Sequence, residues 1–107
     1  MKISNKIILK DLKGHLLKYY GNSIVDVILF GSRTRSNYNQ YSDYDIIIVL
    51  KNDFSGEDEN KILDLCYDIN LKYEIILDVH IISTNELKNL RGKQYFFKNA
   101  IQTGIHA

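Results

Sequence analysis

Apolar residues follow two patterns along the chain, and each pattern predicts one kind of secondary structure. Apolar residues three or four positions apart predict amphipathic helices, and four such segments are present: about residues 4–20, 55–73, 87–90 and 95–101. Nearly continuous apolar runs predict strands of a sheet: residues 24–30, 43–50 and 75–82. No repeat, proline or low-complexity linker interrupts this order, so it predicts one domain over residues 1–107.

Residues at the ends of these segments support the boundaries. Gly21 fits the end of the first helix, where a left-handed residue is often needed. Ser55 fits the start of the second long helix, because a serine hydroxyl can accept a hydrogen bond from the first turn. Residues 83–86 can cap the short helix, and Gly104 can end the last one. The short connection between the first two strands predicts that they are antiparallel neighbours.

Two carboxylates stand two positions apart at the start of the second predicted strand. Asp43 and Asp45 would project from the same face, with their Cβ atoms roughly 6 to 7 Å apart, since a strand rises about 3.3 Å per residue. Carboxylates at that separation can share or bridge hard divalent cations, which take oxygen ligands. The alternative is that Asp43 and Asp45 only cap a turn.

The third predicted strand carries one acidic residue, Asp78, inside an apolar run. A carboxylate there is costly to bury unless it is paired or bound to a metal. If the third strand lies beside the second, Asp78 can project from the same face as Asp43 and Asp45, and cations would relieve the repulsion among the three. The alternative is that Asp78 lies near a strand end and is solvated. His80 alternates with Asp78, so both can face the same side.

A small-residue turn follows the first predicted strand. Glycine at position 31 permits close approach of the backbone to a phosphate, and the Ser32 hydroxyl can add a hydrogen bond. Arg33 and Arg35 could neutralise phosphate oxygens. The alternative is a simple turn with two solvated arginines.

Gly31-Ser32, ten intervening residues and then Asp43-Tyr44-Asp45 resemble the signature of the nucleotidyltransferase fold shared with DNA polymerase β, and in particular its minimal nucleotidyltransferases. The resemblance implies an α+β fold, with a small mixed sheet packed with helices. It implies that Asp43, Asp45 and Asp78 are catalytic and hold two magnesium ions. It also implies that Ser32 contacts the triphosphate of ATP, within a nucleotide-binding segment that includes Gly31, Arg33 and Arg35.

The same resemblance implies transfer of a nucleoside monophosphate, AMP from ATP, to an acceptor hydroxyl. Many minimal nucleotidyltransferases pair with a helical HEPN-domain toxin, as the MntA-type antitoxins do, so the acceptor would be a tyrosine of such a toxin. Two other functions stay open. The chain could mask a partner protein without catalysis, or it could be a nucleotidyltransferase that modifies a small molecule such as an antibiotic.

Composition narrows these functions further. A net charge of +1 without a basic stripe disfavours nucleic acid as a partner. The absence of a signal-peptide pattern and of a long apolar run predicts a cytoplasmic protein without a membrane partner. Cys66 is the only cysteine and lies in an apolar stretch, so we interpret it as a buried structural thiol. The run Tyr95-Phe96-Phe97 predicts at least one exposed or interfacial aromatic, and association between copies of the chain stays open.

Overall fold

A computed structural model describes residues 4–31, 43–89 and 94–107 of the chain. Its elements follow in this order: α1 (Asn5–Tyr20), η1 (Gly21–Ser23), β1 (Ile24–Phe30), β2 (Tyr44–Leu50), α2 (Gly56–Tyr73), β3 (Leu77–Ser83), α3 (Thr84–Lys88), α5 (Tyr95–Thr103) and β4 (Ile105–His106). The predicted arrangement of helices and strands is confirmed, and β4 is an addition to it. Two residues are too few to produce a periodic pattern, so β4 could not be predicted from apolar periodicity.

The four strands form one mixed sheet in the order β3-β2-β1-β4. β1 pairs with β2 in the antiparallel sense, as the short connection predicted, and with β4 in the same sense. β2 and β3 are parallel. The α+β fold with a small mixed sheet is therefore confirmed, and β3 lies beside β2, which is the condition for bringing Asp78 to the other carboxylates.

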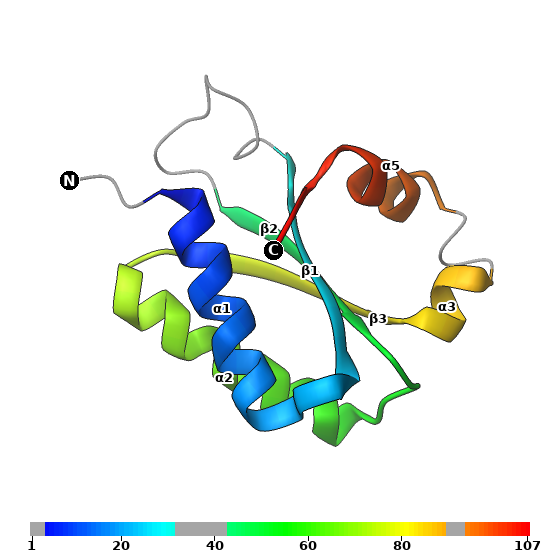
Figure 1. The fold of residues 1–107 in the computed structure, drawn as a ribbon, viewed down its shortest axis with the longest axis horizontal. Helices are drawn as coiled ribbons and strands as arrows, with labels where there is room; N and C mark the ends of the chain where they lie inside the picture. The colour runs from blue at the N-terminus through cyan, green and yellow to red at the C-terminus, as the bar shows by residue number, and fades with distance from the viewer. Residues whose placement is uncertain (1–3, 32–42, 90–93) are drawn as a thin grey trace.

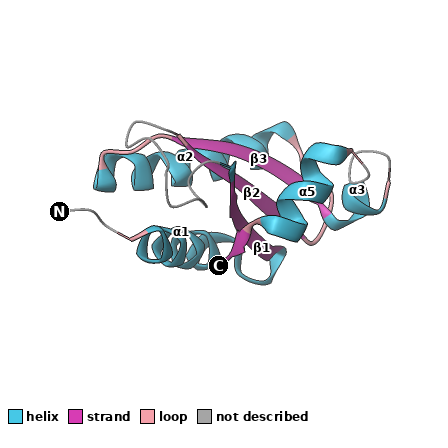
Figure 2. Ribbon diagram, turned by 90° about the horizontal axis from the view of Figure 1, so that it is seen from above, coloured by secondary structure: helices cyan, strands magenta, loops and turns pink. Residues whose placement is uncertain are grey.

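Helices cover both faces of the sheet, but unequally. α1 and α2 lie together on one side of the strands and α5 lies on the other, with α3 near it, in both Figure 1 and Figure 2. The larger core packs between the sheet and the α1–α2 pair, and Ile46 and Ile48 of β2 point into it. Ile47 and Val49 point the other way, into a smaller core that includes Phe97 of α5. Asp45 has the same parity as Ile47, so it lies on the less covered face.

Side-chain caps set several helix boundaries. Ser55 accepts a hydrogen bond from the Asp58 N–H at 3.2 Å, and the Asp58 carboxylate accepts from the Ser55 N–H, which confirms Ser55 as the cap of α2. Ser83 and Glu86 form the same reciprocal box, so α3 begins at Thr84, earlier than the predicted residues 87–90. Gly21 ends α1 with φ of +50°, as expected. Residues 32–42, which include Ser32, Arg33 and Arg35 of the predicted small-residue turn, lie outside the described residues.

Two further side-chain predictions are confirmed. Cys66 is buried in the larger core, and burial raises the pKa of its thiol to about 12, which makes it an unreactive structural residue. Tyr95 is 81% exposed while Phe97 is buried, so the aromatic run does leave a large ring at the surface. In the described ranges, no helix has both the length and the apolar content that a membrane-spanning helix requires.

Candidate active site

The sheet register places two of the predicted catalytic carboxylates side by side. Asp45, at the second position of β2, is the direct partner of Asp78 at the second position of β3. Directly paired residues of neighbouring strands project from the same face of a sheet. On the other side, Asp45 is paired with Phe30 at the end of β1. The site therefore lies where β1 ends and where β2 and β3 begin.

The surroundings of the Asp45 carboxyl disfavour its charged form. Burial raises the pKa of its carboxyl above the ordinary value, and the negative charges of Asp78 and Asp43 raise it further. His80 acts in the opposite direction, and a hydrogen bond with Asp78 favours the protonated form. Asp43 is exposed and stands just before β2. Asp43 and Asp78 are therefore both close enough to affect the Asp45 carboxyl.

The sequence allowed two positions for Asp78, a solvated strand end or a place beside the other carboxylates, and the structure combines them. The Asp78 side chain is 54% exposed and lies near the start of β3, so it is solvated. It is nevertheless paired with Asp45, as the site required. The Nε2 atom of His80 lies 3.8 Å from Oδ2 of Asp78, and the His80 ring packs against Phe30 with the ring centroids 6.2 Å apart. The predicted common face of Asp78 and His80 is confirmed.

Gly31 brings the backbone directly against the Asp45 carboxyl. Its φ is +80°, a conformation that residues with a side chain rarely adopt. A Cβ added there would overlap Oδ2 of Asp45 and lie 3.3 Å from Cγ. Glycine is therefore favoured at position 31 for two physical reasons, the positive φ of the backbone and the close approach of the Asp45 carboxyl. Ser32, Arg33 and Arg35, which follow it, lie outside the described residues.

The carboxylate pair has the chemistry of a site for a hard divalent cation. Two oxygen-donor side chains lie side by side, and the pKa of the Asp45 carboxyl is raised first by burial and then by the charge of Asp78. A bound cation would offset this cost of ionising Asp45. Among the residues that the structure describes, no group of three or more His, Cys, Asp or Glu side chains is assembled to hold a metal. Magnesium is typically held by one or two carboxylates together with waters and substrate phosphates, so Asp45 and Asp78 fit that pattern.

Comparison with known proteins agrees with this geometry. Residues 9–102 match the model of the nucleotidyltransferase domain family. The chain belongs to this family. The match extends from α1 into α5 and therefore includes all the strands that carry the acidic residues of this nucleotidyltransferase domain.

Two proteins of Methanocaldococcus jannaschii are similar to this nucleotidyltransferase domain. The first is 33% identical over 96 residues, which cover 90% of both chains. The second is 31% identical over 70 residues, which cover 65% of this chain and 71% of its own length. Both carry provisional names as protein adenylyltransferases.

Sequence reasoning missed two contacts of the site. Phe30 lies opposite Asp45 and packs on His80, and together they form an apolar border to the carboxylate pair. Phe30 could have been found from the sequence, because it is the last apolar residue before Gly31. Antiparallel pairing of the first two strands then places it beside Asp45. The overlap between Gly31 and Asp45 had no signal in the sequence, because it depends on the local path of the backbone.

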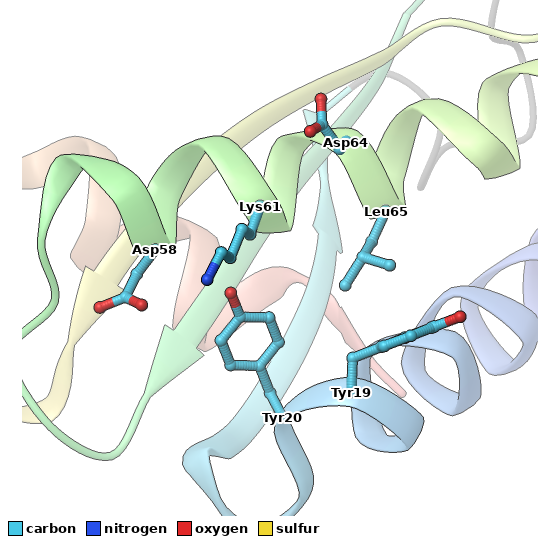
Figure 3. A pocket seen from close by; sticks show the side chains of 6 residues that line it. All are labelled: Tyr19, Tyr20, Asp58, Lys61, Asp64 and Leu65. Atoms are coloured by element: carbon cyan, nitrogen blue, oxygen red, sulfur yellow. The ribbon is translucent and has the colours of Figure 1, made fainter.

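A separate hollow of about 390 Å³ lies between the C-terminal end of α1 and α2 (Figure 3). Its lining residues are Tyr19, Tyr20, Asp58, Lys61, Asp64 and Leu65. The Tyr20 hydroxyl is buried and has no hydrogen-bond partner among the described residues. Burial raises the pKa of Tyr20, with a smaller contribution from the charge of Asp58. This hollow contains none of the carboxylates of the candidate active site.

Replacing Tyr20 with phenylalanine is expected to leave the free energy of unfolding unchanged or to raise it by up to about 1 kcal/mol, because it removes a buried hydroxyl that lacks a partner. Tyr73→Phe is the matched control. The Tyr73 hydroxyl donates to Oδ2 of Asp11 at 2.5 Å, so this second variant should be less stable than the wild type. Urea unfolding of the three proteins measures the difference. A clear loss of stability in Tyr20→Phe would mean that its hydroxyl is hydrogen-bonded after all.

Proposed function

We propose that this nucleotidyltransferase domain transfers AMP from ATP to a hydroxyl group of another protein. The observation that carries the proposal is the direct pairing of Asp45 with Asp78 beside the Gly31 backbone, in a chain that belongs to the nucleotidyltransferase domain family. The provisional names of both relatives support a protein as the acceptor.

The chain's own residues have distinct tasks in this proposal. Asp43, Asp45 and Asp78 hold the magnesium ions, and the exposed Asp78 accepts the proton of the attacking hydroxyl. Gly31 lets the triphosphate approach the backbone, with Ser32, Arg33 and Arg35 as its further contacts. The acceptor oxygen bonds to the α-phosphorus as the bond to pyrophosphate breaks, and pyrophosphate leaves. Bound magnesium supplies neutralisation of phosphate charge and a lower pKa for the attacking hydroxyl.

The finer part of the proposal concerns the acceptor. We propose a tyrosine of a helical HEPN-domain toxin, which the modification would silence, so that this protein acts as an antitoxin. The resemblance to MntA-type antitoxins supports it, and so does the solvated position of Asp78, which a protein-borne hydroxyl could reach. A masking protein without catalysis would have no need for two paired carboxylates, one of which has its pKa raised by burial and by the charge of its neighbour. A small-molecule acceptor remains the competing outcome of the test.

Labelling with ATP tests both levels of the proposal. The purified protein is incubated with magnesium, ATP labelled at the α-phosphate and a lysate of its own host, and the products are separated by size. We expect the label on protein, at a tyrosine, and no label when an Asp43→Asn/Asp45→Asn double variant replaces the wild type. Label on a small molecule would contradict a protein acceptor, and equal labelling by the double variant would contradict the site. Label on a protein without a HEPN domain would contradict only the antitoxin role.

A further inference from the structure

A groove with an apolar floor and a cationic rim lies between α1 and β4, away from the carboxylates. Its volume is about 600 Å³. The apolar side chains that line it are Leu9, Leu17 and Ile105, and the lysines are Lys6, Lys10 and Lys13. Leu17 and Ile105 are 40% and 38% exposed, which is high for large apolar residues. This α1–β4 groove is a surface that apolar side chains could cover at a gain in free energy.

A glycine in the middle of α1 lines the same groove. Gly14 is exposed, its φ is not unusual, and a Cβ added there would meet no atom within 4 Å among the described residues. Glycine in a helix interior is less stable than alanine, and the part of the chain that the structure describes offers no reason for it at this position. Close approach of another backbone is a common reason for an exposed helical glycine. Gly14 is therefore a second observation that indicates an occupant for the groove.

The outer face of α2 has the complementary chemistry. Leu63, Tyr67 and Leu71 stand four residues apart and are 38%, 57% and 62% exposed, so they form an apolar stripe in contact with solvent. The helix that carries this α2 stripe has five carboxylates and two lysines, whereas α1 has four lysines and one aspartate.

Ion pairs between α1 and α2 do not remove this difference in charge between the two helices. Lys72 of α2 bonds Asp11 of α1 at 2.7 Å, so this pair joins a lysine of the mostly acidic helix to the aspartate of the mostly basic one. His15 of α1 pairs with Asp68 of α2 at 2.9 Å. Lys6 and Lys10 of the groove and carboxylates such as Glu59 and Asp64 still face solvent, with opposite signs, whereas Lys13 is half-buried and donates to the Ala107 carbonyl at 2.9 Å.

We propose that the α1–β4 groove of one copy binds the α2 stripe of a second copy, so that the protein associates with itself through two different surfaces. The apolar stripe covers Leu17 and Ile105, and the backbone of the second helix lies against Gly14. The carboxylates of α2 then meet Lys6 and Lys10. Because the two surfaces are not the same patch, the contact is heterologous, and it builds a ring where the rotation between copies closes and an open filament where it does not.

Sedimentation velocity over a range of protein concentrations tests the association. We expect the mass to rise above that of one chain with concentration, and to fall again as salt is added, because the lysine–carboxylate contacts are screened. Gly14→Gln should abolish association although it raises the thermal midpoint, since glutamine is a better helix former than glycine. Tyr67→Ser/Leu71→Ser should also be monomeric. Gly14→Ala, whose added methyl group is small, should keep partial association and a raised midpoint.

Mixing the two monomeric variants separates this pairing from any other. The Gly14→Gln protein keeps an intact stripe and the Tyr67→Ser/Leu71→Ser protein keeps an intact groove, so an equimolar mixture should form a complex of one copy of each. A wild type that stays monomeric at every concentration would overturn the proposal. So would variants that associate alone, or a mixture of monomeric variants that fails to form the complex. Nucleotide transfer plays no part in this measurement, so its result is independent of the proposed function.

Discussion

Replacing Asp45 with asparagine is expected to lower the rate of nucleotide transfer about a thousand-fold or more, and to make the folded chain more stable at neutral pH. The loss of rate follows from removing one carboxylate of the pair, since a bound metal contributes several kcal/mol of charge stabilisation and about 4 kcal/mol is a thousand-fold in rate. The gain in stability follows from the raised pKa of Asp45. A carboxyl whose charged form is disfavoured by burial and by its neighbours destabilises the fold once it ionises.

The raised pKa of Asp45 also determines how the stability of the wild type changes with pH. Between the ordinary carboxyl value of 3.8 and the raised pKa of Asp45, the folded chain keeps a proton that the unfolded chain has released. The contribution of this group to the free energy of unfolding therefore falls as pH rises through that window, and the full cost is present above it. Asp45→Asn should lose this part of the pH dependence, which urea unfolding at several pH values measures.

Magnesium provides the control arm of the same experiment. Added magnesium should raise the thermal midpoint of the wild type, because a cation that binds only the folded carboxylate pair stabilises it by mass action. The shift should be smaller in Asp45→Asn. Asp64→Asn, which removes an exposed carboxylate of α2, is the matched control and should keep both the shift and the activity. An Asp45→Asn protein that transfers nucleotide at the wild-type rate would refute the role of the pair.

The carboxylate arrangement could be predicted because it depends on strand periodicity. Strand alternation predicted a common face for Asp43 and Asp45, and Asp78 stood out as the one acidic residue of an apolar strand. In the structure Asp43 stands just before β2, so the periodicity of the strand applies to Asp45 alone of the first two. The sequence did not determine which strand lies beside β3. In the structure β2 and β3 are parallel neighbours, and their register places Asp45 opposite Asp78.

Other features depend on distances in the folded chain and left no pattern along it. The Asp26 carboxylate and the Ile101 carbonyl accept hydrogen bonds from the ring nitrogens of His106, and these contacts hold β4 beside β1. Asp26 is far from His106 in the sequence, and His106 lies in a strand of only two residues. The solvation of Asp78 was likewise open, since an acidic residue in an apolar run is compatible with a buried site and with a strand end. Strand ends are decided by neighbouring hydrogen bonds, such as the one from the Tyr44 N–H to the Ile76 carbonyl.

Gly31→Ala is expected to lower the rate of nucleotide transfer about a hundred-fold with only a modest loss of stability. Alanine at a φ of +80° costs about 1 to 3 kcal/mol, and its Cβ would overlap Oδ2 of Asp45. Because that oxygen is the end of a side chain, the carboxyl can rotate away and the fold survives. The rotation separates Asp45 from Asp78, and a displacement of about 1 Å in a catalytic group can cost about a hundred-fold in rate.

Gly21→Ala is the control that separates strain from displacement. Gly21 also has a positive φ, of +50°, but a Cβ added there meets no atom within 4 Å in the ranges that the structure describes. Both variants should therefore lose a similar amount of free energy of unfolding, whereas only Gly31→Ala should lose activity and the magnesium-dependent rise in thermal midpoint. Equal losses of activity in the two variants would mean that Gly31 serves the backbone alone. In that case the contact between Gly31 and Asp45 would have no part in catalysis.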